Sequence, residues 1–240
     1  TAQGMFVNFK LIADAMRLRP PFGIAQIGKN FRNEITTGHF IFRLRELEIA
    51  EIEYYVAPAE ADNAPDTWVE AWRQFFADLG IEGDRVRVRP LADDERAHYA
   101  KSNTDFEYEF PFGWGEIAGV ANRTDYDLKN HIEHSGKELA LFDEETKEKM
   151  IPYVIEPTLG LDRLMMTLLV HGFHESDGTD GREAGETVLK LHPAVAPVTV
   201  AVFPLVKKDG LSELAQEVAT TLRTVGLGYI QYDASGSIGR

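Results

Sequence analysis

The stretch FRNEITTGHFIFRLRELEIAEIE, residues 31–53, decides the fold class of this chain. Apolar and charged residues alternate on both sides of its central TTGH loop, as they do in two half-buried neighbouring strands. On the second strand the alternation places Arg43, Arg45, Leu47 and Glu51 on one face. Two adjacent strands that each present a polar, ion-bearing face predict an antiparallel sheet with one working face.

The first strand of this pair brings Arg32 and Glu34 to a common face. A guanidinium on a rigid strand can bind a phosphate through two parallel hydrogen bonds, and a carboxylate beside it can bind an amine. A surface Arg–Glu ladder across the strands fits the same spacing equally well. Arg43 and Arg45 add cations beyond what the nearby carboxylates require, which favours an anionic ligand.

A second stretch, VIEPTLGLDR at 154–163, indicates a strand that carries Glu156, a turn at Gly160 and a helix with Arg163 in its first turn. Helix N-termini favour anions, so an arginine there points to a charged ligand rather than to a structural role. Gly160 permits close approach of the backbone to that ligand. Glu116, within the glycine-flanked GWGEIAG, fits a ligand site and a solvated face equally well.

The rest of the chain supplies elements around this sheet. Helices are expected at 4–17, 65–79, 91–101 and 124–134, and a helix over 160–173 is expected to bury Leu161, Leu164, Met165, Leu168 and Leu169. Residues 105–122 predict two strands that meet at Gly113. Strand 198–205, helix 211–225 and strand 228–233 predict a βαβ unit and therefore a second, α/β domain.

Composition narrows the class of protein. Hydrophobic residues make up 44% and charged residues 27% of the 240, as in ordinary globular proteins. The absence of cysteine excludes disulfides and thiolate zinc sites, and no apolar run reaches membrane-spanning length, so a cytoplasmic protein without a membrane partner is expected. The net charge of 25 − 39 = −14 argues against broad, unspecific nucleic-acid binding.

Six segments resemble, in order and spacing, the class II aminoacyl-tRNA synthetases, and among them the homodimeric glycyl-tRNA synthetase family. They are TAQGMFVNFK, AQIGKNFRNEI, FRLRELEIAEIEYYV, GWGEIAGVANRTDYDLKNH, PYVIEPTLGLDR and LHPAVAPVTVAVFPL. FRNE resembles the second class II motif and GLDR the third. The resemblance implies an α+β fold: a class II antiparallel sheet with flanking helices over 1–192, followed by the start of an α/β anticodon-binding domain over 193–240.

The resemblance implies a glycine–tRNA ligase that uses ATP and Mg²⁺ to make glycyl-adenylate and passes glycine to the 3′ end of tRNA(Gly). Arg32 and Arg163 would be catalytic, Arg32 at the α-phosphate and glycine carboxylate, Arg163 at adenine and the γ-phosphate. The implied ATP-binding residues are Arg32, Asn33, Glu34, Phe42, Arg43, Leu44, Arg45, Glu46, Leu47, Glu116, Ile117, Gly160, Leu161, Asp162 and Arg163, with Glu116 also meeting the ATP-bound Mg²⁺. The implied glycine-binding residues are Leu47, Glu48, Ile49, Ala50, Glu51, Glu156, Pro157, Thr158, Leu159 and Gly160; of these, Glu51, Glu156 and Thr158 would hold the ammonium.

The sequence departs from the family pattern at several points. The first class II motif and a further glycine-binding glutamate would lie before Thr1, and the closing SGSIGR reads as a loop that approaches another element. A piece truncated at both ends is therefore expected, impaired by itself, from a homodimeric parent. Leu47 replaces an aromatic that usually stacks on adenine, and Thr158 replaces a serine but keeps the hydroxyl.

Two other functions remain open from the sequence. One is a class II synthetase of another specificity, such as proline or serine, which an apolar cavity beside Glu51 and Glu156 would favour. The other is a non-catalytic, synthetase-like module that binds nucleic acid. The presence of Arg32, Glu34, Glu156 and Arg163 argues against the latter, because a binding module has no need of them.

Overall fold

The computed structural model describes residues 2–142 and 147–235, so the expected terminal loop falls largely outside the described residues. The chain divides into two compact units, Thr1–Ala77 with Ile81–His171 and Asp78–Gly80 with Gly172–Arg240. This division precedes the expected domain boundary between 192 and 193, and that boundary stays a prediction. No described helix has both the length and the apolar character needed to span a membrane.

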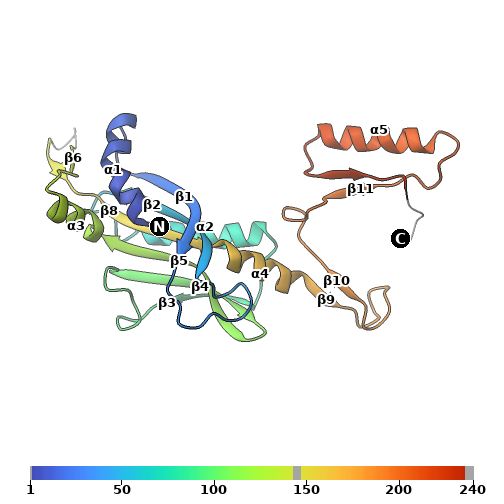
Figure 1. Ribbon diagram of the computed structural model, residues 1–240, viewed down its shortest axis with the longest axis horizontal. Coiled ribbons are helices and arrows are strands. Elements are labelled where there is room, and N and C mark those ends of the chain that lie inside the picture. Colours follow the sequence, from blue (N-terminus) through green and yellow to red (C-terminus); the bar gives the residue numbers. More distant parts are fainter. Residues whose placement is uncertain (1, 143–146, 236–240) are drawn as a thin grey trace. The chain divides into compact units, whose positions relative to one another are not determined.

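The first unit is built on a six-stranded antiparallel sheet in the order β1-β2-β8-β5-β4-β3 (Figure 1). Its strands are β1 (Phe22–Phe31), β2 (Glu46–Val56), β3 (Val86–Pro90), β4 (Ser102–Phe110), β5 (Gly113–Thr124) and β8 (Tyr153–Gly160). Its helices are α1 (Ala2–Met16), α2 (Ala64–Asp78), α3 (Tyr126–Ser135) and α4 (Leu161–Gly172). The expected antiparallel α+β fold is confirmed, including the strand pair that meets at Gly113.

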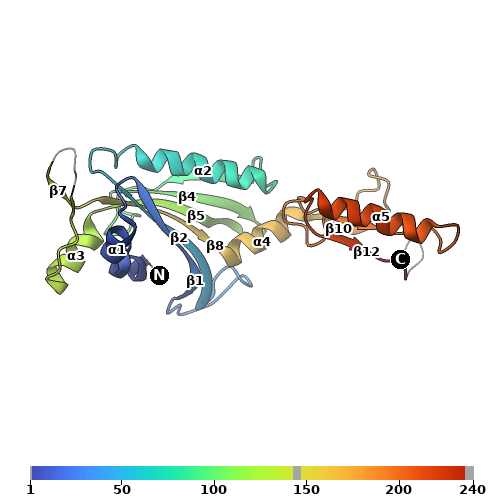
Figure 2. The same cartoon turned by 90° about the horizontal axis from the view of Figure 1, so that it is seen from above.

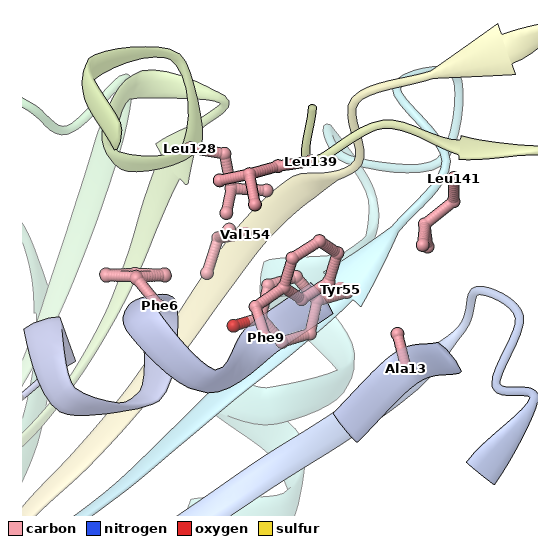
Figure 3. Packing of buried hydrophobic residues seen from close by; sticks show 8 residues of the cluster. All are labelled: Phe6, Phe9, Ala13, Tyr55, Leu128, Leu139, Leu141 and Val154. Carbon is pink, nitrogen blue, oxygen red and sulfur yellow. The ribbon is translucent and has the colours of Figure 1, made fainter. Parts of the chain in front are cut away.

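The two faces of the sheet are covered differently (Figure 2). Helix α2 packs Trp68, Val69 and Trp72 against a core that contains Val120 and Ile155. On the opposite face, helices α1 and α3 cover one end. The buried cluster there contains Phe6, Phe9, Ala13, Tyr55, Leu128, Leu139, Leu141 and Val154 (Figure 3). The rest of that face is the working face, because the alternating side chains of β2 and β8 turn their polar members toward it.

The smaller unit contains the predicted βαβ arrangement. Strand β11 (Val200–Val202) pairs in parallel with β12 (Ile230–Tyr232), and α5 (Leu211–Thr224) connects them. Two further strands, β9 (Phe173–Glu175) and β10 (Thr187–Leu189), form a hairpin in the same unit, and β6 (Leu141–Phe142) pairs with β7 (Lys149–Met150) in the first.

The arginine-bearing hairpin is shorter than its alternation predicts. The ladder between β1 and β2 ends at the pair Phe31–Glu46, and one more hydrogen bond joins the Arg32 amide to the Arg45 carbonyl at 2.9 Å. Residues 32–45 therefore form a loop, and the expectation that their arginines lie on strands is wrong. The backbone at His39 and Phe40 is left-handed, with φ of 52° and 55°, which an extended strand cannot accommodate.

Two helix expectations are also wrong. Residues 91–101 form successive turns rather than a helix, because hydrogen bonds from the Arg89 side chain to Glu95 and from the Arg96 side chain to the Lys101 carbonyl fix local bends. Helix α4 does not bury the five expected residues: Met165 and Leu169 are 56% and 39% exposed, and Leu161, Leu164 and Leu168 are only partly buried.

We expect Phe9→Ala to lower the free energy of unfolding by about 3–5 kcal/mol, because the substitution leaves a cavity against rigid neighbours. Phe9 is fully buried, and its ring lies 4.4 Å from that of Tyr55 between centroids. Urea unfolding followed by circular dichroism measures the change. Val7→Ala on the same helix is the control, since Val7 is 67% exposed and should change the value by less than about 0.5 kcal/mol. Equal effects of the two substitutions would contradict this packing.

Candidate functional site

A pocket opens on the working face between the 32–45 loop, β2, β5, β8 and the start of α4. It brings together most of the site residues expected from sequence. Its lining includes Arg32, Glu34, Phe42, Arg43, Leu44, Leu47, Glu48, Ile49, Glu116, Ile117, Thr158, Gly160, Asp162 and Arg163, with Ile41 and Ala118.

Arg163 lies at the centre of this pocket. Its Nη1 donates to the Glu116 carbonyl at 2.7 Å and to Glu116 Oε2 at 3.0 Å, while Nε donates to the Phe42 carbonyl at 3.1 Å. Its guanidinium also stacks 4.3 Å above the centroid of the Phe42 ring. Arg163 thus joins three segments that are distant in sequence, and its planar head is already presented for stacking.

The ring of Phe42 packs directly against the backbone of Gly115. A Cβ added to Gly115 would lie 2.6 Å from Phe42 Cζ, so only glycine leaves room for this ring. The rings of Phe110 and Phe112 lie 5.3 Å and 5.1 Å from it between centroids. The aromatic floor beneath Arg163 is therefore a packed feature, built from the loop and the turn between β4 and β5.

The other two arginines near the end of the loop, Arg43 and Arg45, differ in whether they line the pocket. Arg43 Nη1 lies 3.5 Å from Glu34 Oε2, and both residues line the pocket with Arg32. Arg45 does not line it: its side chain donates to the carbonyls of Glu34 at 2.9 Å and Ile35 at 3.2 Å and so ties the loop together. The expectation that Arg45 contacts a ligand stays a prediction, while its observed contacts are structural.

The predicted excess of cations is wrong for this pocket. Arg32, Arg43 and Arg163 are matched by four carboxylates in the lining, those of Glu34, Glu48, Glu116 and Asp162. The alternation of residues 31–53 did not predict this balance of charges, because Glu116 and Asp162 belong to other elements of the fold. An anionic ligand would therefore have to replace carboxylates such as Glu34 and Glu116 at the arginines.

The start of α4 forms one wall. Asp162 Oδ2 accepts from the Glu48 amide at 2.8 Å, which fixes the helix end against β2, and Gly160 and Thr158 precede it along β8. A helix N-terminus attracts negative charge through its unpaired amides. A phosphate or carboxylate of a ligand is thus favoured at this wall.

Nine expected site residues lie outside the pocket lining. They are Asn33, Arg45, Glu46, Ala50, Glu51, Glu156, Pro157, Leu159 and Leu161. Glu46 pairs with Lys29, and Leu159 is buried in the sheet. Glu51 and Glu156 are 7% exposed each and lie on the same sheet face as Thr158, which is the cross-strand partner of Glu51.

A buried ion network surrounds Glu156, and sequence reasoning missed its centre, Arg123. Arg123 Nη1 donates to both oxygens of Glu156 at 3.0 and 2.8 Å, and its Nε and Nη2 donate to Asp127 at 2.7 and 2.9 Å. Burial lowers the pKa of Arg123, but hydrogen bonds to Asp127 and the charge of Glu156 outweigh it and raise the pKa above its ordinary value. The sequence does contain an indication of this network: Arg123 directly follows the largely apolar segment GEIAGVAN, and an arginine in a buried segment is expected to be paired.

A second set of acidic side chains, Asp105 and Glu107, lies next to Glu116 of the pocket. Glu107 accepts from Arg87 at 2.5 Å and from Arg89 at 3.1 Å, and nearby Asp105 accepts from Asn103 at 2.8 Å. Burial raises the pKa of Asp105 to about 6, and the charge of Glu116 adds to that rise. Among the described residues no cluster of three His, Cys, Asp or Glu side chains could bind a metal ion by itself.

Comparison with known proteins gives this architecture a context. Residues 9–172 match the family of the tRNA synthetase class II core domain (G, H, P, S and T), and the match ends where the first compact unit ends. The chain is 48% identical over its whole length to a glycine–tRNA ligase of Corynebacterium efficiens and 50% identical to one of Caldanaerobacter subterraneus. It spans 53% and 50% of these two proteins, about half the length of the curated relatives it matches.

A solved structure supports the fold. The Giardia lamblia prolyl-tRNA synthetase in complex with prolyl-adenylate superposes with a TM-score of 0.68 over 92% of this chain and 42% of that chain. At 18% identity this likeness concerns the fold alone.

We expect Asp105→Asn to change how stability depends on pH. Because the folded-state pKa of Asp105 is raised to about 6, its contribution is fully present below its ordinary value near 4 and is lost as pH rises through 6. The wild type should therefore gain stability relative to Asp105→Asn as pH falls from about 7 to about 4. Urea unfolding at four pH values measures this difference, with the exposed Asp84→Asn as control. A difference that is constant with pH would refute the assignment.

Proposed function

Because this chain belongs to the tRNA synthetase class II core domain family, we propose that the whole protein that contains it is a glycine–tRNA ligase. It would activate glycine with ATP and transfer it to tRNA(Gly). The observation that carries this proposal is the convergence of Arg32, Arg43 and Arg163 on one pocket beside the α4 N-terminus. These three arginines come from two separate segments that the fold brings together.

ATP fits the charges and surfaces of this pocket. Its phosphates would take the place of Glu34 at Arg43 and of Glu116 at Arg163, since bidentate guanidinium–phosphate hydrogen bonds are stronger than exposed ion pairs. The Arg163 guanidinium carbon lies 4.3 Å from the centroid of the Phe42 ring, and this guanidinium would stack on adenine and reach the γ-phosphate. Leu47, where the family usually has an aromatic, would make plain apolar contact with the base.

The reaction needs alignment and charge neutralisation rather than a protein nucleophile. A glycine carboxylate oxygen bonds to the α-phosphorus, the bond to the β-phosphate breaks and pyrophosphate leaves. Arg32 would hold the α-phosphate and the glycine carboxylate together as this bond forms. A terminal ribose hydroxyl of the tRNA then attacks the glycyl carbonyl carbon, and AMP leaves with the bonding electrons.

Glycine would bind beside the nucleotide, at the β2–β8 part of the working face. Thr158 lines the pocket, and Glu51 and Glu156, which lie outside its lining, are buried on the same sheet face beside Thr158. These carboxylates and the Thr158 hydroxyl would hold the ammonium. A close wall next to the glycine Cα would exclude larger amino acids by clash, which discriminates more strongly than a reward for a smaller one.

Glu116 fits a role in binding Mg²⁺ together with ATP. Its side chain is 46% exposed on the pocket wall, and Mg²⁺ in nucleotide sites is held by one or two carboxylates and the substrate phosphates. The ion would neutralise phosphate charge when bound. A homodimer, a cytoplasmic location and an anticodon-binding role for the βαβ unit complete the proposal.

Amino-acid-dependent exchange of pyrophosphate into ATP by the whole protein tests the function. We expect exchange with glycine and none with proline or serine. The 240-residue chain alone should exchange more slowly than the whole protein. Exchange with proline or serine in place of glycine would move the proposal to another specificity, and no exchange with any amino acid would support a binding module.

ATP binding tests the pocket separately. Arg163→Ala should weaken ATP binding roughly 10- to 100-fold, because it removes a charge-assisted phosphate contact and the stacking surface. Equilibrium dialysis with labelled ATP measures the affinity. Lys207→Ala, an exposed cation of the other unit, should leave the affinity unchanged. Equal affinities of Arg163→Ala and wild type would place the nucleotide elsewhere.

A further inference from the structure

Glu53 is the most unusual buried group of the working face. Its side chain is 0% exposed, and within the described part of the chain neither carboxylate oxygen has a hydrogen-bond partner. It lies on β2 two residues after Glu51, on the same face, and the register places it beside Glu156 of β8. An uncompensated buried carboxylate is costly, so its presence at this position calls for a physical reason.

Among the described residues, no cation forms a hydrogen bond with Glu53. Arg123 from β5 is engaged by Glu156 and by Asp127 of α3. Within β2 the flanking side chains are Glu51 and Tyr55, and no described residue forms a hydrogen bond with the Tyr55 hydroxyl. From α1, Gln3 bonds Asp127, and Phe6 lies 5.5 Å from the Arg123 guanidinium. Among the described residues, this cluster contains the carboxyl groups of Glu51, Glu53, Asp127 and Glu156 and the guanidinium of Arg123.

Burial and the charge of Glu156 raise the pKa of Glu53 to about 9, with smaller contributions from Glu51 and Asp127. Arg123 opposes this rise without overcoming it. At neutral pH Glu53 is therefore a neutral acid. The same burial and the charge of Glu53 raise the pKa of Tyr55, which stays protonated.

We propose that Glu53 is a positioning residue of the amino-acid site, which gives up its proton when the substrate ammonium binds at Glu51 and Glu156. The inference rests on the proposed function. An ammonium placed beside these two carboxylates adds a positive charge close to Glu53, and this favours ionisation of Glu53. The proton passes to solvent, and the new carboxylate charge strengthens the hold on the ammonium. Binding of a cationic amino group and loss of one proton are thus linked.

The linkage fixes the sign of a pH effect. The pKa of Glu53 is about 9 in the protein without glycine. If the bound ammonium lowers this pKa, the affinity for glycine rises as pH rises toward 9. Glu53→Gln keeps the shape of the side chain but has no such proton to release. The ratio of the glycine KM of Glu53→Gln to that of the wild type should be near one at pH 7 and grow roughly threefold or more by pH 9. The titration of glycine itself cancels in this ratio.

Glycine-dependent pyrophosphate exchange by the whole protein between pH 7 and 9 is the experiment, with exposed Glu82→Gln as the matched control. A rising ratio for Glu53→Gln and a flat ratio for the control support the inference. If the KM ratio for Glu53→Gln differs from one but does not change with pH, Glu53 has a purely structural role and the inference is wrong. Absence of exchange by the wild type overturns the proposed function and this inference with it.

Calorimetry keeps the test valid if Glu53→Gln does not fold. Glycine is titrated into the wild type at pH 8 in two buffers of different ionisation enthalpy. A buffer-dependent heat that corresponds to release of a fraction of a proton supports the inference. Binding heat that is independent of the buffer overturns it.

Discussion

The first unit depends on one buried interaction, the contact of Arg123 with Glu156 and Asp127. This guanidinium joins β5, β8 and α3 at the point where the sheet passes from its covered end to its working face. Removal of one partner of such a network typically costs about 3–5 kcal/mol, because a charge is then left buried and unpaired. The same contacts fix Glu156, so the amino-acid end of the proposed site is rigid because the fold requires it.

The end of the pocket that we propose for the nucleotide is built in a different way, from ion pairs at the surface that a ligand can replace. Arg163 and Arg43 contact carboxylates that a phosphate can displace, and Arg45 keeps the loop in place without entering the pocket. Gly115 provides the space in which the Phe42 ring supports Arg163. One working face therefore combines a fixed, buried acidic end with an adaptable cationic end, which suits a reaction between a small ammonium-bearing substrate and a polyphosphate.

The sequence predicted that the two arginine segments meet, and Arg32, Glu34, Arg43 and Arg163 do line one pocket, although the alternation that placed the first three on strands was wrong. The loop geometry could not be predicted, because the left-handed backbone at His39 and Phe40 leaves no trace in the hydrophobic pattern. Residues 91–101 likewise have the composition of a solvated helix, but side-chain hydrogen bonds to backbone carbonyls bend them into turns.

The sequence by itself determined the antiparallel sheet, the flanking helices, the parallel βαβ arrangement and the family, because these follow from local periodicity and from motifs of fixed spacing. Only the tertiary structure decided the charge balance of the pocket and the isolation of Glu53. Both depend on which side chains from distant strands become neighbours, and the pairing of β2 with β8 and of β8 with β5 places them there. The sequence pattern of a strand does not show whether a glutamate will lie next to a cation or next to another acid. Burial beside other carboxyl groups raises the pKa of Glu53, so that it keeps its proton at neutral pH.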